Sequence, residues 1–363
     1  MKVALVYDRV NKWGGAERVL LALHSLFPTA PLYTSVYSKK QTNNWTDVFS
    51  VKTSFLQKIP FAARAHEAFP YLMPLAFESF DFSDYDLVIS VTSEAAKGII
   101  TNNKTKHICY CLTPTRYLWS GYDFYFKNQY LRNLSQPVVR YLRKWDKIAS
   151  RRPDKLIAIS QEVQNRIEKY YGLNSDVIYP PLTLENKIKS IKKLDEPPFL
   201  LVISRLVPYK RIDLAIKACN RLRLPLRIIG MGSEMSYLQK IAGPTVKFLG
   251  SLTDEEVIAY YNNCRGLIFP GNEDFGLTVV EAQQYGKPVL AYKAGGAQET
   301  IIEGKTGLFF SSQSVGSVTE MLDKFSHFRY NAEDCRRQAR KFSLKVFQSK
   351  FMRIVDEVMR ENL

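Results

Sequence analysis

Two carboxylates stand eight positions apart in the second half of the chain, at Glu273 and Glu281. An apolar run at 266–269 precedes them, and a run of helical character from 278 to 285 follows a glycine-bearing loop. This order predicts a strand, a loop and a helix N-terminus. Helix N-termini attract phosphate groups, because their amides are unpaired and the dipole end is positive. Since two acids would repel an anion there, we expect them to accept hydrogen bonds from sugar hydroxyls.

Two cations, Arg205 and Lys210, stand where the predicted strand at 199–204 opens onto a helix. An Arg fork and a Lys point charge at that place can hold a diphosphate and stabilise it as it departs. Two solvated surface cations would give the same pattern. The sequence GxxxxGK[ST] is missing, which argues against a P-loop nucleoside triphosphatase.

Paired glycines, Gly14 and Gly15, follow the predicted strand at 3–7 and precede a helix expected to begin near Ala16. They would let the backbone approach a ligand closely. The other interpretation is a simple tight turn. The pattern GxGxxG is absent here, so the dinucleotide-binding fingerprint is not met.

Apolar strands alternate with helical patterns along the chain, which predicts an α/β fold of two parallel, doubly wound sheets. A stretch rich in proline and lysine at 179–198 is typical of a linker. We therefore expect two domains, 1–182 and 183–342, facing across a cleft that binds ligands at the carboxyl ends of the strands. The predicted strands are 3–7, 87–91, 108–111, 156–160, 177–179, 199–204, 226–229, 246–249, 267–269 and 289–292.

The composition favours a globular protein over one that spans a membrane or is secreted. The 363 residues are 46% apolar and 24% charged, which is ordinary for a globular chain with two cores. No apolar run approaches the roughly 20 residues of a membrane-spanning helix. The first residues read as a strand and not as a signal peptide. Five scattered cysteines predict a reduced, cytoplasmic protein with no metal site.

The formal charge of +16 calls for an anionic partner. Between 127 and 155 the chain carries nine Lys or Arg residues and two Asp, and Ser135 and Pro137 suit a helix start. A basic amphipathic helix around 137–152 would rest on an anionic membrane surface, unless its apolar side simply packs in the core. No nucleic-acid-binding motif is visible, so nucleic acid is not expected as a partner. The apolar positions at helical spacing are Val138, Tyr141, Leu142, Trp145, Ile148 and Ala149.

Taken together, these motifs resemble a retaining nucleotide-sugar glycosyltransferase of the GT-B fold, family GT4. Within that family the chain is most similar to bacterial mannosyltransferases of O-antigen and related polysaccharide assembly. The resemblance implies two Rossmann-like domains, with a last helix at 343–363 that crosses back onto the first. It rests on the order and spacing of segments 14–18, 85–90, 96–98, 110–119, 204–210, 273–281 and 295–300.

The resemblance implies roles in the donor half of the reaction. Arg205 and Lys210 would bind the donor diphosphate, Glu273 would hold the transferred sugar, and Glu281 would hold the ribose. The acceptor hydroxyl would attack on the face that the diphosphate leaves, with no metal and no double displacement by paired carboxylates. Further donor contacts would come from Gly14, Gly15, Gly250, Leu252, Phe275, Gly276, Leu277 and Thr278.

The resemblance also implies an acceptor side, with one departure. Relatives typically carry His where this chain has Leu112, which cannot bond a sugar hydroxyl. An altered donor sugar, slower turnover and a degenerate subunit all remain open. His107 lies nearby and is expected to be an ordinary strand residue. The acceptor-side candidates are Glu17, His66, Leu112, Arg116, Tyr117 and Trp119.

The predicted function is transfer of a hexose from a GDP- or UDP-sugar, with mannose from GDP-mannose preferred, and with no cofactor. The acceptor would be a glycan, either a polysaccharide or one linked to polyprenyl diphosphate, at the inner face of the cell membrane. Two alternatives stand beside this prediction. One is a soluble glycosyltransferase with a small-molecule acceptor, and the other is a weakened subunit that only binds sugar nucleotides.

Overall fold

The computed structural model describes residues 1–363 except 43, 66–68, 127, 183–193 and 361–363. The chain divides into two compact units. Unit 1 comprises Met1–Pro180 and Phe347–Leu363, and unit 2 comprises Pro181–Val346. The sequence places the boundary at 182–183, and residues 183–193 of its expected linker lie outside the described residues.

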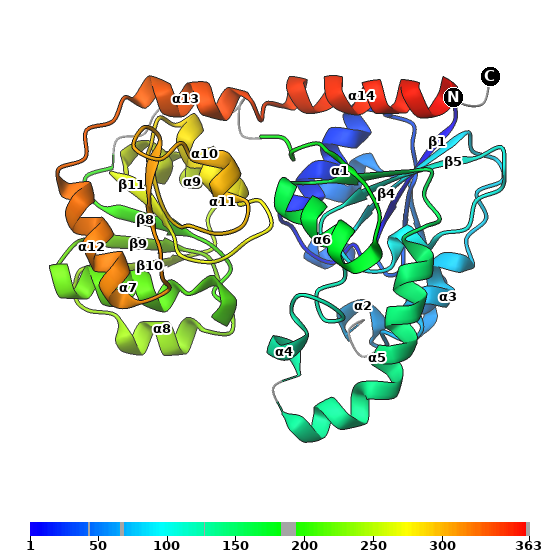
Figure 1. Cartoon of the computed structure of the whole chain (residues 1–363), viewed down its shortest axis with the longest axis horizontal. Helices are drawn as coiled ribbons and strands as arrows, with labels where there is room; N and C mark the ends of the chain where they lie inside the picture. The colour runs from blue at the N-terminus through cyan, green and yellow to red at the C-terminus, as the bar shows by residue number, and fades with distance from the viewer. Residues whose placement is uncertain (43, 66–68, 127, 183–193, 361–363) are drawn as a thin grey trace. The chain divides into compact units, whose positions relative to one another are not determined.

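Unit 1 is built on a parallel seven-stranded sheet in the order β3-β2-β1-β4-β5-β6-β7. Figure 1 labels β1, β4 and β5 of this sheet. The chain adds strands on one side of β1 and then returns to add the rest on the other side. The direction of winding therefore reverses between β1 and β4. The strands are β1 (Val3–Tyr7), β2 (Leu32–Thr34), β3 (Val51–Thr53), β4 (Leu87–Thr92), β5 (Lys106–Cys111), β6 (Lys155–Ala158) and β7 (Asp176–Val177).

Helices cover this sheet, and the last helix of the chain belongs to unit 1. Phe347 and Phe351 of that helix lie 5.9 and 6.4 Å from the ring of Tyr110 on β5, centroid to centroid. Burying three aromatic rings together fixes the helix to the sheet. The helices of unit 1 are α1 (Gly15–Leu26), α2 (Ala62–Ala65), α3 (Met73–Glu78), α4 (Tyr122–Tyr125), α5 (Gln129–Ala149), α6 (Gln161–Tyr171) and α14 (Leu344–Arg360).

Unit 2 contains a parallel six-stranded sheet in the order β10-β9-β8-β11-β12-β13. Its winding reverses between β8 and β11. The strands are β8 (Leu200–Ile203), β9 (Leu226–Ile229), β10 (Val246–Gly250), β11 (Gly266–Phe269), β12 (Val289–Tyr292) and β13 (Gly307–Phe310). The helices are α7 (Ile212–Leu222), α8 (Met235–Ile241), α9 (Asp254–Asn263), α10 (Leu277–Gln284), α11 (Ala297–Thr300), α12 (Val315–Ser326) and α13 (Ala332–Arg340).

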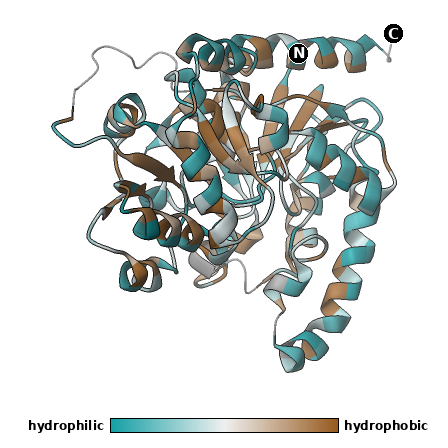
Figure 2. Ribbon diagram, turned by 60° about the vertical axis from the view of Figure 1, so that its left-hand side comes forward, coloured by the Kyte–Doolittle hydropathy of each residue, from teal (hydrophilic) through white to brown (hydrophobic). Residues whose placement is uncertain are grey.

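Both faces of the unit 2 sheet are buried, as continuous apolar strands require. Along β8, Leu200 and Val202 join one core cluster, which α7, α8 and α12 complete. Leu201 points the other way, into the cluster completed by α9 and α10. Strand residues alternate between these two cores, and the hydropathy colours of Figure 2 show the strands as largely apolar. The expected α/β fold of two parallel, doubly wound sheets is confirmed.

The ten predicted strands are all present, with ends shifted by a few residues. Strands β2, β3 and β13 are not predicted from the sequence. Two of these have three residues, and the partly exposed β3 pairs only with β2, at the edge of its sheet. Such segments are too short to show a periodicity of their own.

The basic helix α5 is longer than the sequence predicts. It begins at Gln129, and Pro137 lies inside it rather than at its start. The expected start at Pro137 is therefore wrong, because proline is preferred at a helix start but is not confined to it. Among the described residues, no helix is both long and apolar enough to cross a bilayer.

Candidate functional site

Three of the charged residues singled out in unit 2 lie in the segments that follow two of its strands, at the point where its sheet reverses direction. Arg205 and Lys210 follow β8, and Glu273 follows β11, which is paired with β8 in parallel. The carboxyl ends of neighbouring parallel strands lie at one edge of the sheet. Open α/β sheets bind ligands in the crevice that forms at such a reversal.

Lys210 and Glu273 form an ion pair through Nζ and Oε2. The Lys210 side chain is 9% exposed and that of Glu273 is 21% exposed, so the pair is largely shielded from water. Arg205 is exposed, and its Nη2 donates a hydrogen bond of 2.7 Å to the hydroxyl of Tyr209. The Lys210 ammonium also lies 5.1 Å from the centre of the Tyr209 ring. Tyr209 therefore contacts both cations, a role that the sequence does not predict.

Three glycines fix the loop that carries Glu273. A Cβ on Gly271 would lie 3.1 Å from the Cα of Lys210. A Cβ on Gly295 would lie 2.3 Å from the carbonyl oxygen of Glu273, and one on Gly296 would lie 2.3 Å from the Cα of Phe275. The Gly296 amide donates to that same Glu273 carbonyl at 3.0 Å. Glycine is needed here because backbone packs directly against backbone.

The N-terminus of α10 follows this loop. Gly276 caps the helix in the left-handed region, at φ 85°, and, being a glycine, it supplies no side-chain cap. Leu277 and Thr278 open the helix and are half-buried, while Phe275 is buried against the ring of Phe342. The structure confirms the predicted strand, loop and helix. A helix N-terminus without a side-chain cap can hold an anion.

Glu281 lies in α10, facing α9 rather than Lys210. Its side chain is buried, and its Oε2 accepts a hydrogen bond of 2.7 Å from the hydroxyl of Tyr261. The ring of Tyr261 stacks on that of Tyr285, with centroids 5.5 Å apart and planes 14° apart. These two tyrosines position the carboxylate. Their only signal in the sequence is that both lie in apolar helical runs, which does not distinguish them from core residues.

Gly250 and Leu252 lie at the end of β10. Gly250 has a φ of 68°, and its carbonyl accepts a hydrogen bond of 2.8 Å from the amide of Gly230. Leu252 packs against the core cluster beside α9 and α10. Their predicted contact with the base of a nucleotide stays a prediction.

Unit 1 has a similar reversal point, but the carboxylate of Asp8 fills it. Asp8 follows β1, is 1% exposed, and accepts hydrogen bonds from the backbone amides of residues 93–96 at 2.6 to 3.0 Å. The hydroxyl of Thr92 adds a further bond at 2.9 Å. These amides already hold an anion of the chain itself. The reversal point of unit 2, where two cations stand, is the better site for a phosphate.

Gly14 and Gly15 belong to unit 1 and begin α1, as expected. Glu17 lies in the first turn of that helix and is buried, and its Oε1 accepts a hydrogen bond of 2.7 Å from Tyr7. Burial and this carboxylate together raise the pKa of Tyr7, so the phenol remains a donor. No described residue bonds to the other Glu17 oxygen, Oε2, which has the capacity to accept one hydroxyl.

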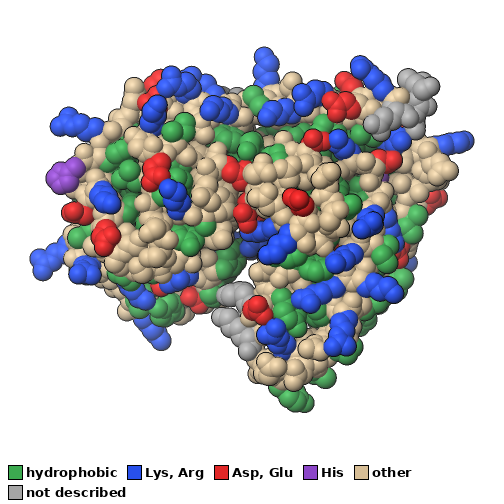
Figure 3. All heavy atoms as spheres, in the orientation of Figure 1, with side chains coloured by type: hydrophobic (Ala, Val, Ile, Leu, Met, Phe, Trp, Pro, Cys, Tyr) green, Lys and Arg blue, Asp and Glu red, His purple; other side chains and the backbone are tan. Residues whose placement is uncertain are grey.

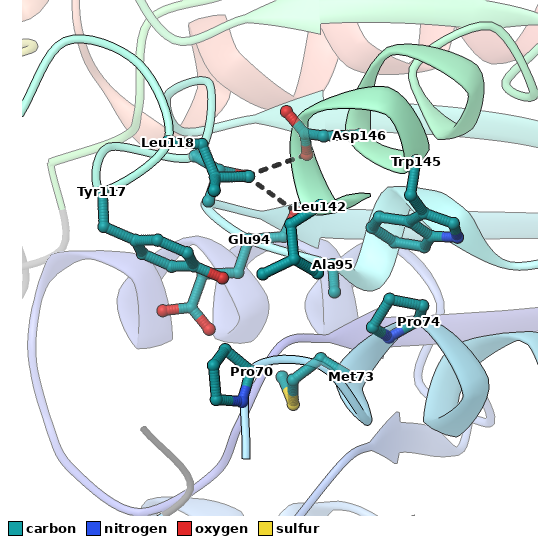
Figure 4. Close-up of a pocket in the computed structure, with 11 residues that line it drawn as sticks. Pro70, Met73, Pro74, Glu94, Ala95, Tyr117, Leu118, Leu142, Trp145 and Asp146 are labelled. Atoms are coloured by element: carbon teal, nitrogen blue, oxygen red, sulfur yellow. Dashed lines mark hydrogen bonds between the residues drawn. The ribbon is translucent and has the colours of Figure 1, made fainter. Parts of the chain in front are cut away.

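Two other acceptor-side candidates lie in the segment that follows β5. Leu112 is half-buried, and its amide donates to the carbonyl of Thr92 at 2.8 Å. Tyr117 lines a small pocket of unit 1 and points toward Glu94 (Figure 4). Burial raises the pKa of Glu94, and the guanidinium of Arg9, 2.6 Å away, opposes that rise.

The remaining acceptor-side candidates have different surroundings. Trp119 donates through Nε1 to Asp146 at 2.7 Å and stacks on Tyr170 at 5.3 Å. Those contacts hold the ring in place, and its role on the acceptor side stays a prediction. Arg116 is half-buried within unit 1. His66 lies outside the described residues.

Asp146 is the centre of a buried network that the sequence analysis missed. Its Oδ1 lies 2.6 Å from Nζ of Lys97, and both side chains are 1% exposed. Thr115 and Tyr171 also donate to the carboxylate, at 2.9 and 2.8 Å. Buried charges must be paired and hydrogen-bonded to be tolerated. The network therefore ties α5, which carries Asp146, to the segments on either side of β5.

His107 and the cysteines have structural surroundings. His107 is buried on β5, where its Nε2 lies 2.7 Å from the hydroxyl of Ser90, and burial lowers its pKa to about 3. All five cysteines are buried and free, as expected. Among the described residues, no three His, Cys, Asp or Glu side chains gather as metal ligands would.

A model of a known protein family matches most of the second unit. Residues 184–342 match the family model of the glycosyl transferases group 1. A GDP-mannose-dependent phosphatidylinositol monomannoside mannosyltransferase of Mycolicibacterium smegmatis is 29% identical over 166 residues, 41% of this chain and 44% of that protein. The D-rhamnosyltransferase WbpZ of Pseudomonas aeruginosa is 26% identical over 226 residues, 59% of this chain and 58% of that protein. The match spans about half the length of such relatives.

Solved structures match over nearly the whole chain. The Anabaena protein Alr3699/HepE, solved in complex with UDP-glucose, has a TM-score of 0.71 at 19% identity, covering 98% of this chain and 100% of that one. The sucrose-phosphate synthase of Thermosynechococcus elongatus has a TM-score of 0.78 at 15% identity, covering 99% and 100%. These likenesses show a GT-B fold. The chain therefore has the GT-B fold, and its residues 184–342 are similar to the glycosyl transferases group 1.

Proposed function

We propose that this protein is a retaining glycosyltransferase that moves a hexose from a nucleotide sugar to a glycan acceptor, with mannose from GDP-mannose as the favoured donor. The observation that carries the proposal is the ion pair of Lys210 and Glu273 at the reversal point of the unit 2 sheet, where Tyr209 contacts both Lys210 and Arg205. Relatives named as GDP-mannose-dependent support the choice of donor. We further propose a polyprenyl-diphosphate-linked glycan as the acceptor.

In this proposal the chain supplies charge and position. Arg205 and Lys210 neutralise the diphosphate as it leaves, helped by the N-terminus of α10, so that no metal is needed for this purpose. Glu273 accepts hydrogen bonds from hydroxyls of the transferred sugar, and Glu281 from the ribose. The acceptor hydroxyl attacks on the face that the diphosphate leaves, and a diphosphate oxygen takes its proton.

A panel of nucleotide sugars tests this function. The donor should raise the melting temperature, because a ligand that binds only the folded state stabilises it by mass action. Lys210→Ala and Glu273→Ala should each lose transfer, measured as release of the nucleoside diphosphate in the presence of an acceptor glycan. Lys293→Ala is the matched control, since Lys293 is exposed and paired with Glu303 at 2.9 Å.

Two results would count against the proposal. Unchanged transfer by both Lys210→Ala and Glu273→Ala would show that the site is wrongly assigned. Binding of a donor without transfer to any acceptor would favour the alternative of a weakened subunit, in which Leu112 replaces the histidine of relatives.

We also propose that α5 holds the protein at an anionic membrane surface. Leu142 and Ala149 of the predicted apolar side are buried, but Val138, Tyr141 and Ile148 are exposed. Tyr130 and Leu134, two helical turns and one helical turn before Val138, are 76% and 69% exposed and extend this apolar side. Lysine and arginine side chains flank this apolar side. Figure 3 shows basic side chains in blue and apolar side chains in green along the helix. An exposed apolar side with basic flanks suits the interface of an anionic bilayer.

Vesicle sedimentation tests the membrane proposal. Binding to vesicles with phosphatidylglycerol should fall when salt is raised, because screening weakens attraction between surface charges. Replacing Tyr130 and Leu134 together with Ser should weaken binding about tenfold or more, as expected for two lost apolar side chains. Ile302→Ser, at an exposed apolar residue of unit 2, is the control. Absence of binding at low salt would favour a soluble enzyme with a small-molecule acceptor.

A further inference from the structure

The ammonium of Lys210 already has an anionic partner within the chain. Its Nζ contacts Oε2 of Glu273. The proposed function assigns the same ammonium to the diphosphate and the same carboxylate to the transferred sugar. One cation therefore faces two competing anions, and the competition must be resolved whenever a nucleotide binds.

The two residues cannot avoid each other by moving their backbones. Gly271, two positions before Glu273, packs against the backbone of Lys210, and Gly295 packs against the carbonyl of Glu273. Both side chains are mostly buried, so the bulk solvent is a poor substitute for the partner that either one loses. Opening the pair is favourable only if the ligand offers a new partner to each side chain.

A nucleotide sugar and a nucleoside diphosphate differ in what they offer. Both give phosphate oxygens to Lys210. The nucleotide sugar also gives hydroxyl donors to Glu273, so every charged group is paired again. The nucleoside diphosphate has no hydroxyl at that position, and it leaves an unpaired carboxylate close to its own negative charge. Such juxtaposition of like charges is unfavourable in a partly buried site.

We propose that Glu273 competes with the bound diphosphate for Lys210 and thereby sets the preference of the site for the donor over the spent nucleoside diphosphate. The inference rests on the proposed function, and it adds a second task for Glu273 beyond holding the sugar. Once the sugar has been transferred, Glu273 returns to Lys210 and weakens the hold on the product. Arg205, which is bonded to Tyr209 instead, takes no part in this exchange.

The test measures dissociation constants of GDP, GDP-mannose, UDP and UDP-glucose by calorimetry, for the wild-type protein and for Glu273→Gln. The amide keeps the shape of the side chain and the capacity to accept a sugar hydroxyl, but it cannot pair with Lys210 as an anion. We expect Glu273→Gln to bind the nucleoside diphosphate roughly fivefold to tenfold more tightly, between the upper limit for an exposed ion pair and the lower limit for a hydrogen bond to a charged group. The nucleotide sugar should bind no more tightly than it does to the wild type.

Two controls isolate the exchange. Asp274→Asn removes the same charge one residue along the loop while leaving the Lys210–Glu273 pair in place, and it should change the ratio of the two constants by less than twofold. In a Lys210→Met background, Glu273→Gln should no longer tighten the nucleoside diphosphate. The resulting double-mutant cycle measures the coupling between the two residues.

The outcomes separate this inference from the proposed function. If the wild type binds nucleotide sugars and Glu273→Gln binds the nucleoside diphosphate no more tightly, the exchange is refuted and the proposed function stands. An equal gain in Asp274→Asn would also refute it, since general repulsion would then explain the effect. If the wild type binds none of the four nucleotides, both the proposed function and the exchange are refuted.

Discussion

At the scale of single residues, the site depends on side chains that touch no expected ligand. Tyr209 holds Arg205 through its hydroxyl, and Tyr261 holds Glu281 in the same way. Both tyrosines are aromatic residues in or beside apolar runs. Their sequence pattern is therefore that of core residues. Their task becomes visible only when hydroxyl and partner are seen within 2.7 Å.

Tyr261→Phe should weaken binding of the nucleotide while leaving the fold intact. The change removes the hydrogen bond to Glu281 but keeps the ring stacked on Tyr285. A lost hydrogen bond to a charged group predicts a dissociation constant about tenfold higher. Calorimetry with the nucleotide sugar measures this, and Tyr260→Phe on the same helix is the control. Equal effects of the two variants would show that Tyr261 does not position Glu281.

His107 should make stability depend on pH in acid. Burial and then Arg152 lower its pKa from 6.5 to about 3 in the folded chain. Between those values the unfolded chain binds the proton and the folded chain does not. The contribution is therefore complete above pH 6.5 and is lost as pH falls toward 3, at up to about 1.4 kcal/mol per pH unit. In urea unfolding between pH 7 and 4.5, the free energy of unfolding should fall less steeply with falling pH for His107→Gln than for the wild type. Equal slopes would contradict this account.

At the scale of elements, the loop between β11 and α10 is positioned by a second loop far along the chain. Gly295 and Gly296, which follow β12, pack against the backbone that carries Glu273. The sequence shows a glycine pair there, and the resemblance includes the segment, but neither reveals what the glycines touch. The contact exists because β11 and β12 are neighbours in the sheet, which is a property of topology.

Gly295→Ala should raise the dissociation constant for the nucleotide sugar more than tenfold. Its new Cβ would lie 2.3 Å from the carbonyl oxygen of Glu273, so the loop must shift. Gly304→Ala is a matched control, because Gly304 also has a positive φ, 76°, and its Cβ would meet nothing within 4 Å. Both variants carry the left-handed strain of about 1–2 kcal/mol, and only Gly295→Ala carries the clash. Similar binding by the two would show that the contact is not needed.

At the scale of the whole molecule, each unit has its own sheet and its own core, and the candidate chemistry is divided unequally between them. The reversal point of unit 1 is filled by Asp8, whereas that of unit 2 presents Arg205, Lys210 and Glu273. Unit 1 instead contains the buried pair of Lys97 and Asp146. Burial and the carboxylate act oppositely on the pKa of Lys97, and the net effect is a raised pKa that keeps the ammonium charged.

Lys97→Met should destabilise unit 1 without disturbing nucleotide binding in unit 2. Removing one partner leaves the carboxylate of Asp146 buried and without its cation, which costs about 3–5 kcal/mol. The melting temperature should fall, while the dissociation constant for the nucleotide sugar, measured well below that temperature, should stay within twofold. Lys106→Met is the control, since Lys106 forms a looser pair with Asp154 at 3.5 Å. A large loss of nucleotide binding would contradict the separation of the two roles.

The sequence by itself determined the class of fold and the identity of the charged residues at the candidate site. Alternation of apolar strands and helices requires parallel sheets buried on both faces, and the motif around Glu273 and Glu281 specifies a strand, a loop and a helix, because these depend on local patterns. Only the tertiary structure decided which residues meet. It paired Lys210 with Glu273, turned Glu281 toward Tyr261, and placed Tyr130 and Leu134 on the exposed side of α5. Those contacts depend on the order of the strands in each sheet and on which elements pack against one another. The spacing of residues along the chain does not specify either of these.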